Sequence, residues 1–169
     1  MKEEAGLSHD FSTAHTNSSS LLGGPATLTV DDLAQMAQTN SEDVREFWVA
    51  MGFPSPRAEE KVFTENDARL FVEWSKFIAS GAIDQATARS LLRANSHLAD
   101  RLGLWQVEAL VEDTMRRYGL DDTAARMYVL DHIRERVDMF DELLRHSWRR
   151  QLDALLKRMD HEIATRGHE

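Results

Sequence analysis

The 169-residue sequence contains no cysteine, only three prolines and no long apolar run. The absence of thiols excludes disulfides, thiolate catalysis and cysteine-based zinc sites. No segment approaches the roughly 20 consecutive apolar residues that a membrane-spanning helix needs. The N-terminus also lacks the basic, apolar and cleavable pattern of a secretion signal. We therefore expect a cytoplasmic protein with no transmembrane segment.

Basic residues are outnumbered by acidic ones, 20 to 29, which gives a formal net charge of −9. A chain of this charge repels polyanions, so we expect no nucleic-acid partner. The sequence has no glycine-rich phosphate loop, no H-E-x-x-H pair and no nucleophile elbow. Its carboxylates fall where helix caps and solvated faces need them. We expect no catalytic residues, no metal site and no enzymatic activity of this chain alone.

A period-two alternation is missing from the sequence, whereas apolar residues recur at steps of three and four. This pattern predicts an all-α protein. It would be a helical bundle with a helix-turn-helix-like N-terminal part and a long C-terminal helix, or two near-collinear helices. Residues 1–27 are rich in serine, threonine and histidine and predict a disordered leader. Residues 28–120 are expected to form the helical core, and residues 121–166 the long helix.

Local signals predict where the core helices begin and end. Thr29 and Thr64 are each followed three residues later by an aspartate, which predicts two capping boxes. Ser41 is expected to cap a second helix, which ends before Gly52. Asp84 is expected to cap a further helix in the same way.

Two glycines are expected to divide the rest of the core. Gly103 is predicted to end the helix that starts at Asp84, and Gly119 to end another that runs from Leu104 to Tyr118. Glycine is common at such ends because it adopts left-handed backbone angles at no steric cost.

The last third of the chain contains neither proline nor glycine between Asp122 and Arg166. At about 1.5 Å per residue, a helix of some 45 residues would extend about 65 Å, which is longer than a domain of this size. Its apolar residues form a seam suited to a partner helix, so we expect a homodimer. The seam residues are Val137, Phe140, Leu144, Trp148, Leu152, Leu155, Met159 and Ile163.

Aromatic residues are concentrated on the core helices and allow two interpretations. They either pack the core, or they line an apolar pocket that accepts a lipid-like tail. The pocket candidates are Phe71, Trp74, Phe77 and Trp105. Arg89, Arg93 and Arg134 are candidates for holding a ligand carboxylate, because they lie on mainly apolar helices.

Three histidines of the terminal segment are candidates for a pH switch: His132, His146 and His161. Histidine titrates between pH 5 and 8, so acidification would add positive charge along this segment. The simpler alternative is that they are solvated surface residues.

The two short helices predicted within residues 28–51, followed by a loop, resemble the winged-helix head of MerR-type regulators. In that family the second helix enters the DNA major groove. Here that helix carries Glu42, Asp43 and Glu46 but only one cation, Arg45, so its surface would repel phosphates. A MerR-like transcriptional regulator is therefore the alternative rather than the first hypothesis.

Three segments together resemble the N-terminal regulatory domain of actinobacterial class III adenylate cyclases. They are LTVDDLA (residues 28–34), VREFWVAMGFP (44–54) and FTEND (63–67), and the resemblance extends over roughly residues 28–165. It implies a non-catalytic, all-helical homodimer that precedes a cyclase catalytic domain, inhibits it, and releases it at acidic pH through the last helix. It also implies a possible bound fatty acid. A stand-alone fatty-acid-binding helical module is a further alternative.

Overall fold

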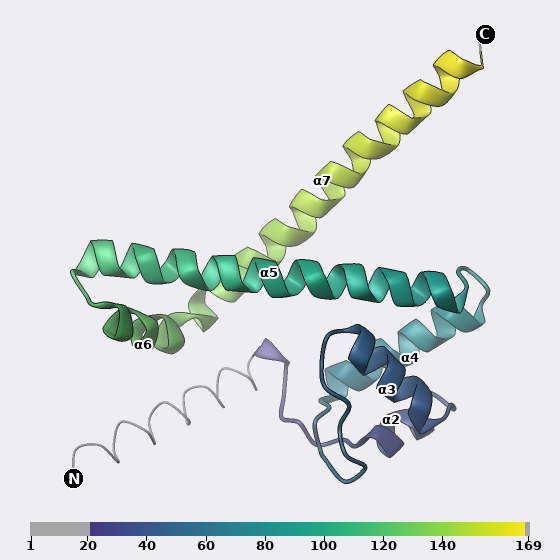
Figure 1. Ribbon diagram of the computed structural model, residues 1–169, viewed down its shortest axis with the longest axis horizontal. Coiled ribbons are helices and arrows are strands. Elements are labelled where there is room, and N and C mark those ends of the chain that lie inside the picture. Colours follow the sequence, from purple (N-terminus) through teal and green to yellow (C-terminus); the bar gives the residue numbers. More distant parts are fainter. Residues whose placement is uncertain (1–20, 168–169) are drawn as a thin grey trace. The chain divides into compact units, whose positions relative to one another are not determined.

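The computed structural model describes residues 21–167, and this part of the chain contains six helices (Figure 1). The described residues contain no strand, only an isolated antiparallel bridge between Leu28 and Phe63. The all-α prediction is therefore confirmed. The helices are α2 (Val30–Met36), α3 (Ser41–Ala50), α4 (Glu65–Ala79), α5 (Gln85–Tyr118), α6 (Asp122–His132) and α7 (Arg134–Arg166).

The chain divides into two compact units between Asp131 and His132. The first contains α2 to α5 and nearly all of α6, and the second contains α7. The expected leader lies mostly outside the described residues. Within the part that is described, the Thr27 amide donates to the carbonyl of Phe63, and the Asn66 side chain donates to the carbonyl of Leu22.

The predicted helix starts in the core are confirmed at three positions. Thr29 and Thr64 each form a complete capping box with the aspartate three residues later. Asp84 accepts a hydrogen bond from the Thr87 amide at the start of α5. The prediction for Ser41 is off by one residue: the cap of α3 is Asn40, whose side chain accepts from the Asp43 amide. Asparagine is about as favourable as serine at an N-cap position, and here Asn40 directly precedes Ser41.

Gly52 follows α3 with a φ of 97°, as predicted for the residue after a helix end. The amides of Gly52 and Phe53 donate back to the carbonyls of Val49 and Trp48, the two bonds of a Schellman motif. A Cβ at residue 52 would lie 2.5 Å from the Ser96 hydroxyl oxygen, which itself bonds the Met51 carbonyl. The end of α3 is thereby tied to the middle of α5.

The prediction that Gly103 ends a helix is wrong, because α5 passes through this residue as one helix of 34 residues. A glycine inside a helix costs only about 1 kcal/mol relative to alanine. The good helix formers on both sides outweigh that cost, and Gly103 does not take a positive φ. Gly119 does end the helix, with a φ of 65°.

The terminal segment forms two helices and not one, because the helix is interrupted at Ile133. The first of the two helices begins where predicted, with the Asp121 carboxylate accepting from the Ala124 amide.

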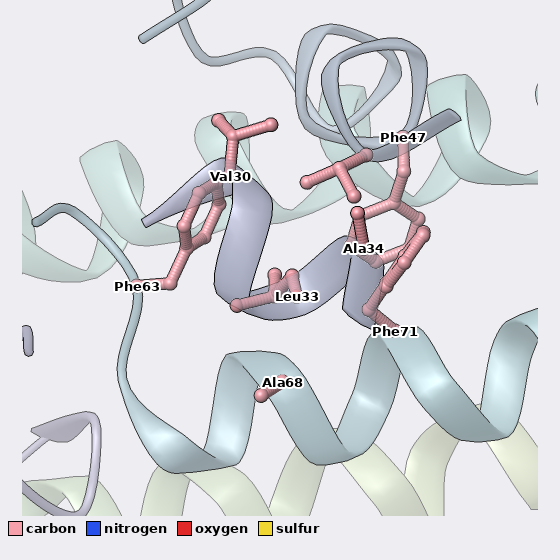
Figure 2. Close-up of a cluster of buried hydrophobic side chains, with 8 residues drawn as sticks. Val30, Leu33, Ala34, Phe47, Phe63, Ala68 and Phe71 are labelled. Carbon is pink, nitrogen blue, oxygen red and sulfur yellow. The ribbon is translucent and has the colours of Figure 1, made fainter. Parts of the chain in front are cut away.

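The core of the first unit forms where α2 packs against α3 and α4 (Figure 2). Leu33 and Phe63 are completely buried, and the rings of Phe47 and Phe71 lie 5.1 Å apart. Burial of such side chains contributes about 1.5–3 kcal/mol each. The buried cluster consists of Val30, Leu33, Ala34, Val44, Phe47, Phe63, Ala68 and Phe71.

A second packed region joins α5 to α6. Arg126 donates to both carboxylate oxygens of Glu108, at 2.9 and 3.1 Å, and to Asp122 at 2.9 Å. These contacts raise the pKa of Arg126 and lower that of Glu108. Val111 of α5 and Ala125 of α6 are buried in the same unit.

Candidate functional site

A pocket of ≈ 330 Å³ opens between α2, α3, α4 and the start of α5, wholly within the first unit. This volume is within the range of small-molecule sites. The residues around it are Ala37, Gln38, Thr39, Asp43, Glu46, Phe47, Ala50, Phe71, Trp74, Ser75, Ile78, Ala79, Gln85, Ala88, Arg89 and Leu92.

Aromatic and small apolar side chains make the wall of the pocket. Phe47 and Phe71 are buried and also belong to the core cluster, so this wall is fixed by core packing. Trp74 is half-buried and packs against the same cluster. The small side chains of Ala50 and Ala88, both buried, leave room between α3 and α5.

Charged side chains make the rim. Asp43 and Glu46 are three residues apart on α3 and therefore share a helix face. Glu46 lies 4.0 Å from Arg89 of α5, and the two side chains are 53% and 48% exposed. The Thr39 hydroxyl donates to the Asp43 carboxylate. The rim therefore carries two carboxylates and one guanidinium.

Gln38, which lines the pocket, has a φ of 56° and is the one non-glycine residue with positive φ in the described part of the chain. It stands directly after the end of α2, where its amide and that of Thr39 donate to Gln35 and Ala34. Glycine or asparagine is usual at this position because a Cβ is strained there.

Two of the four predicted pocket residues line the pocket, and the other two do not. Phe71 and Trp74 line the pocket, whereas Phe77 is 43% exposed and Trp105 is 62% exposed, and neither is among the lining residues. Their role in holding a ligand stays a prediction. Of the three arginines expected near a carboxylate, only Arg89 lines the pocket.

Sequence reasoning missed the two acidic residues of the rim, Asp43 and Glu46. In the sequence they are only two of the acidic residues on a helix whose surface would repel DNA. Their position three residues apart was visible, but nothing local indicated that α5 would bring Arg89 beside them.

The seam of α7, all of whose residues are described, contains no buried side chain. Trp148 is 56% exposed and Ile163 69% exposed in the single chain. The pairs Val137–Trp148 and Trp148–Met159 are each eleven residues apart. An eleven-residue repeat keeps the seam on one side of a nearly straight helix.

The candidate histidines do not lie on this seam. His146 precedes Trp148 by two residues and His161 follows Met159 by two, and residues two apart do not share a helix face. Both histidines therefore lie on the face away from the seam. His132 is the last residue of α6, before the interruption at Ile133.

Other groups on α7 carry charge but form few ion pairs. Asp153 and Lys157 are 2.8 Å apart, and this contact lowers the pKa of Asp153. Among the described residues, no group of three histidine, aspartate or glutamate side chains is placed to hold a metal ion.

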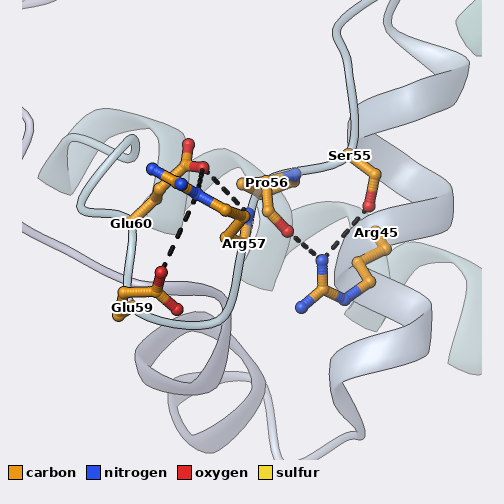
Figure 3. Close-up of polar contacts among 6 residues, drawn as sticks. All are labelled: Arg45, Ser55, Pro56, Arg57, Glu59 and Glu60. Atoms are coloured by element: carbon orange, nitrogen blue, oxygen red, sulfur yellow. Dashed lines mark hydrogen bonds and ion pairs between the residues drawn. The ribbon is translucent and has the colours of Figure 1, made fainter.

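Arg45, the one cation of α3, is engaged by the loop that follows the helix (Figure 3). It donates to the Ser55 hydroxyl at 3.1 Å and to the Pro56 carbonyl. In the same loop Arg57 pairs with Glu60 at 2.6 Å. These contacts occupy the arginine that a helix inserted into DNA would need for phosphate.

No helix in the described range 21–167 is long and apolar enough to span a bilayer.

Two proteins named adenylate cyclase are similar to this chain. One, from Glutamicibacter nicotianae, is 34% identical over 145 residues, which are 86% of this chain and 36% of the relative. The other, from Streptomyces coelicolor, is 26% identical over 136 residues, 79% of this chain and 35% of the relative. The chain thus spans about a third of the length of these relatives. No protein-family model matches it, and no solved structure gives a significant match.

Proposed function

We propose that this chain is a non-catalytic regulatory domain of a cytoplasmic class III adenylate cyclase. The observation that carries the proposal is the similarity to two adenylate cyclases over most of this chain but only about a third of theirs. The remaining two thirds leave room for a catalytic domain. The acidic α3 and the engagement of Arg45 by its loop support this proposal over a DNA-binding function.

In this proposal α7 passes the state of the domain to the catalytic part. A helix with an exposed apolar seam needs a partner surface, and a second copy supplies an identical one. The eleven-residue spacing suits a long pairing of two nearly straight helices. A parallel pair would bring the two C-terminal ends together, and with them two catalytic domains whose active sites the resemblance places between protomers.

Acidic pH is the proposed signal, and His146 and His161 are the proposed sensors. His146 has Glu142, Arg149 and Arg150 one turn away, and His161 has Lys157 and Arg158. Protonation adds charge to the helix face away from the seam. It therefore changes the contacts of α7 with whatever covers that face, and it shifts regulation only if that cover differs between active and inactive states.

The test uses the full-length cyclase with both histidines changed to glutamine. We expect the activation between pH 8 and pH 5.5 to be reduced severalfold, while activity at pH 8 stays the same. His97→Gln is the matched control, because His97 is an exposed histidine on α5. An unchanged acid response in the double variant would remove these histidines from the mechanism.

The regulatory role itself is tested by deleting residues 1–166 from the full-length enzyme. We expect the remaining catalytic part to lose its dependence on pH. A truncated enzyme that keeps the same pH profile would contradict a regulatory role for this chain.

A further inference from the structure

The pocket at the α3–α5 junction has no part in the proposed passage of a signal along α7. It nevertheless has the volume of a ligand site, a fixed aromatic wall and a charged rim. The chemistry of its ligand can be inferred from these two surfaces, independently of the cyclase function.

The rim of the pocket carries a net negative charge. Asp43 and Glu46 contribute two carboxylates, and Arg89 alone opposes them at 4.0 Å from Glu46. The whole chain adds to this field with its net charge of −9. A bound carboxylate would be attracted by one group and repelled by two, whereas a bound ammonium would experience the reverse.

The wall of the pocket favours the same class of ligand. Trp74, Phe47 and Phe71 present aromatic rings, and aromatic faces attract organic cations as well as apolar groups. Ala50, Ala88 and Leu92 add an aliphatic surface for the apolar part of such a molecule.

We propose that this pocket binds an organic ammonium ion with a short apolar body. The ammonium group lies between Asp43 and Glu46 and faces the ring of Trp74, and the body lies against Ala50, Ala88 and Leu92. The fatty acid implied by the family resemblance carries the opposite charge, so the two ligand classes can be separated by experiment.

The test is calorimetric titration of the 169-residue chain with three probes of one chain length: octylammonium, octanol and octanoate. All are used at pH 7 and low salt, below the concentrations at which they form micelles. We expect octylammonium to bind about tenfold more tightly than octanoate, with octanol between them. The preference should weaken at 0.5 M salt, because exposed charges are screened.

Three other outcomes would each overturn the proposal. Tighter binding of octanoate than of octylammonium would assign the pocket to fatty acids. Equal binding of all three probes would show a purely apolar site. No binding of any probe would show that the pocket is not a site for short amphiphiles.

Two double variants locate the effect. Asp43→Asn with Glu46→Gln leaves Arg89 unopposed, so the order of the ammonium and carboxylate probes should reverse. Glu42→Gln with Glu73→Gln removes two exposed carboxylates that do not line the pocket, and therefore changes the net charge equally. The order of the probes should persist in this control. If the order of the probes reverses in both double variants, the preference comes from the net charge and not from the pocket.

A third variant examines the wall. Trp74→Leu keeps an apolar side chain but removes the aromatic face, so octylammonium should lose severalfold more affinity than octanol. Thermal melting of each variant establishes that it is folded. An equal loss for both probes would place the ammonium group away from Trp74.

Discussion

The helices α2, α3 and α4 bury side chains against one another, whereas the much longer α7 buries none. The three short helices contain 7, 10 and 15 residues, and helices of this length are marginal in water by themselves. Their stability comes from the shared core. The 33 residues of α7 carry an equally regular apolar pattern with nothing in its own unit to cover it. The same periodicity thus gives a buried core in one region and an exposed apolar face in the other.

The largest expected effect is a difference in the free energy of unfolding between a substitution in the core and one on α7. Phe63→Ala should destabilise the first unit by about 3–5 kcal/mol, because it empties a completely buried site. Met159→Ala should change the stability of the monomer by less than about 0.5 kcal/mol, since Met159 is exposed. Urea denaturation at low protein concentration measures both. A large loss for Met159→Ala in a monomer would mean that α7 is covered within the chain.

The second expected effect concerns association through α7. Leu152→Glu should weaken the proposed homodimer at least tenfold, because it places a charge in the apolar seam. Leu143→Glu is the matched control: nine residues away, it lies on the opposite face of the helix and is likewise exposed. Sedimentation equilibrium gives both dissociation constants. Equal weakening by the two substitutions would contradict a single seam.

Local signals explain what the sequence predicted correctly. The capping boxes at Thr29 and Thr64 depend on residues three positions apart. Gly119 adopts the left-handed conformation that is favoured by glycine at the end of a helix. The prediction at Gly103 is wrong because the cost of one glycine is small beside the helix preferences of its neighbours. The interruption at Ile133 has no glycine or proline to signal it.

The candidate site was only partly predictable for a different reason. Phe71 and Trp74 are three residues apart and share a face of α4, but this spacing could not tell that Phe77, three residues further on, would be left at the surface. The rim of the pocket joins α3 to α5 across more than 40 residues of sequence, between Glu46 and Arg89. Such a pair depends on how helices pack, which periodicity within one helix does not encode.

A smaller effect is expected at the strained end of α2. Gln38→Gly should stabilise the first unit by about 1 kcal/mol, because glycine adopts the positive φ without a Cβ penalty. The gain is limited by the larger entropy that glycine loses on folding. Thermal unfolding measures it, with Gln35→Gly, inside α2, as a control that should destabilise. A loss of stability in Gln38→Gly would mean that the side chain itself makes a stabilising contact.

The smallest effect distinguishes the acid sensitivity of the core from that proposed for α7. Hydrogen bonds from the Thr29 backbone and side chain hold the pKa of Asp32 below its ordinary value. A depressed carboxyl pKa contributes stability that is present above the unfolded pKa and is lost as pH falls through the folded pKa. Asp32→Asn should therefore flatten the decline of stability below about pH 4, where aspartate titrates. It should leave the response of the full-length enzyme between pH 5 and 8 unchanged, because that window belongs to histidine. Unfolding curves measured from pH 2 to 8, beside activity over the upper half of that range, test both statements. A variant that alters the activity profile would tie the sensing of pH to the first unit and not to α7.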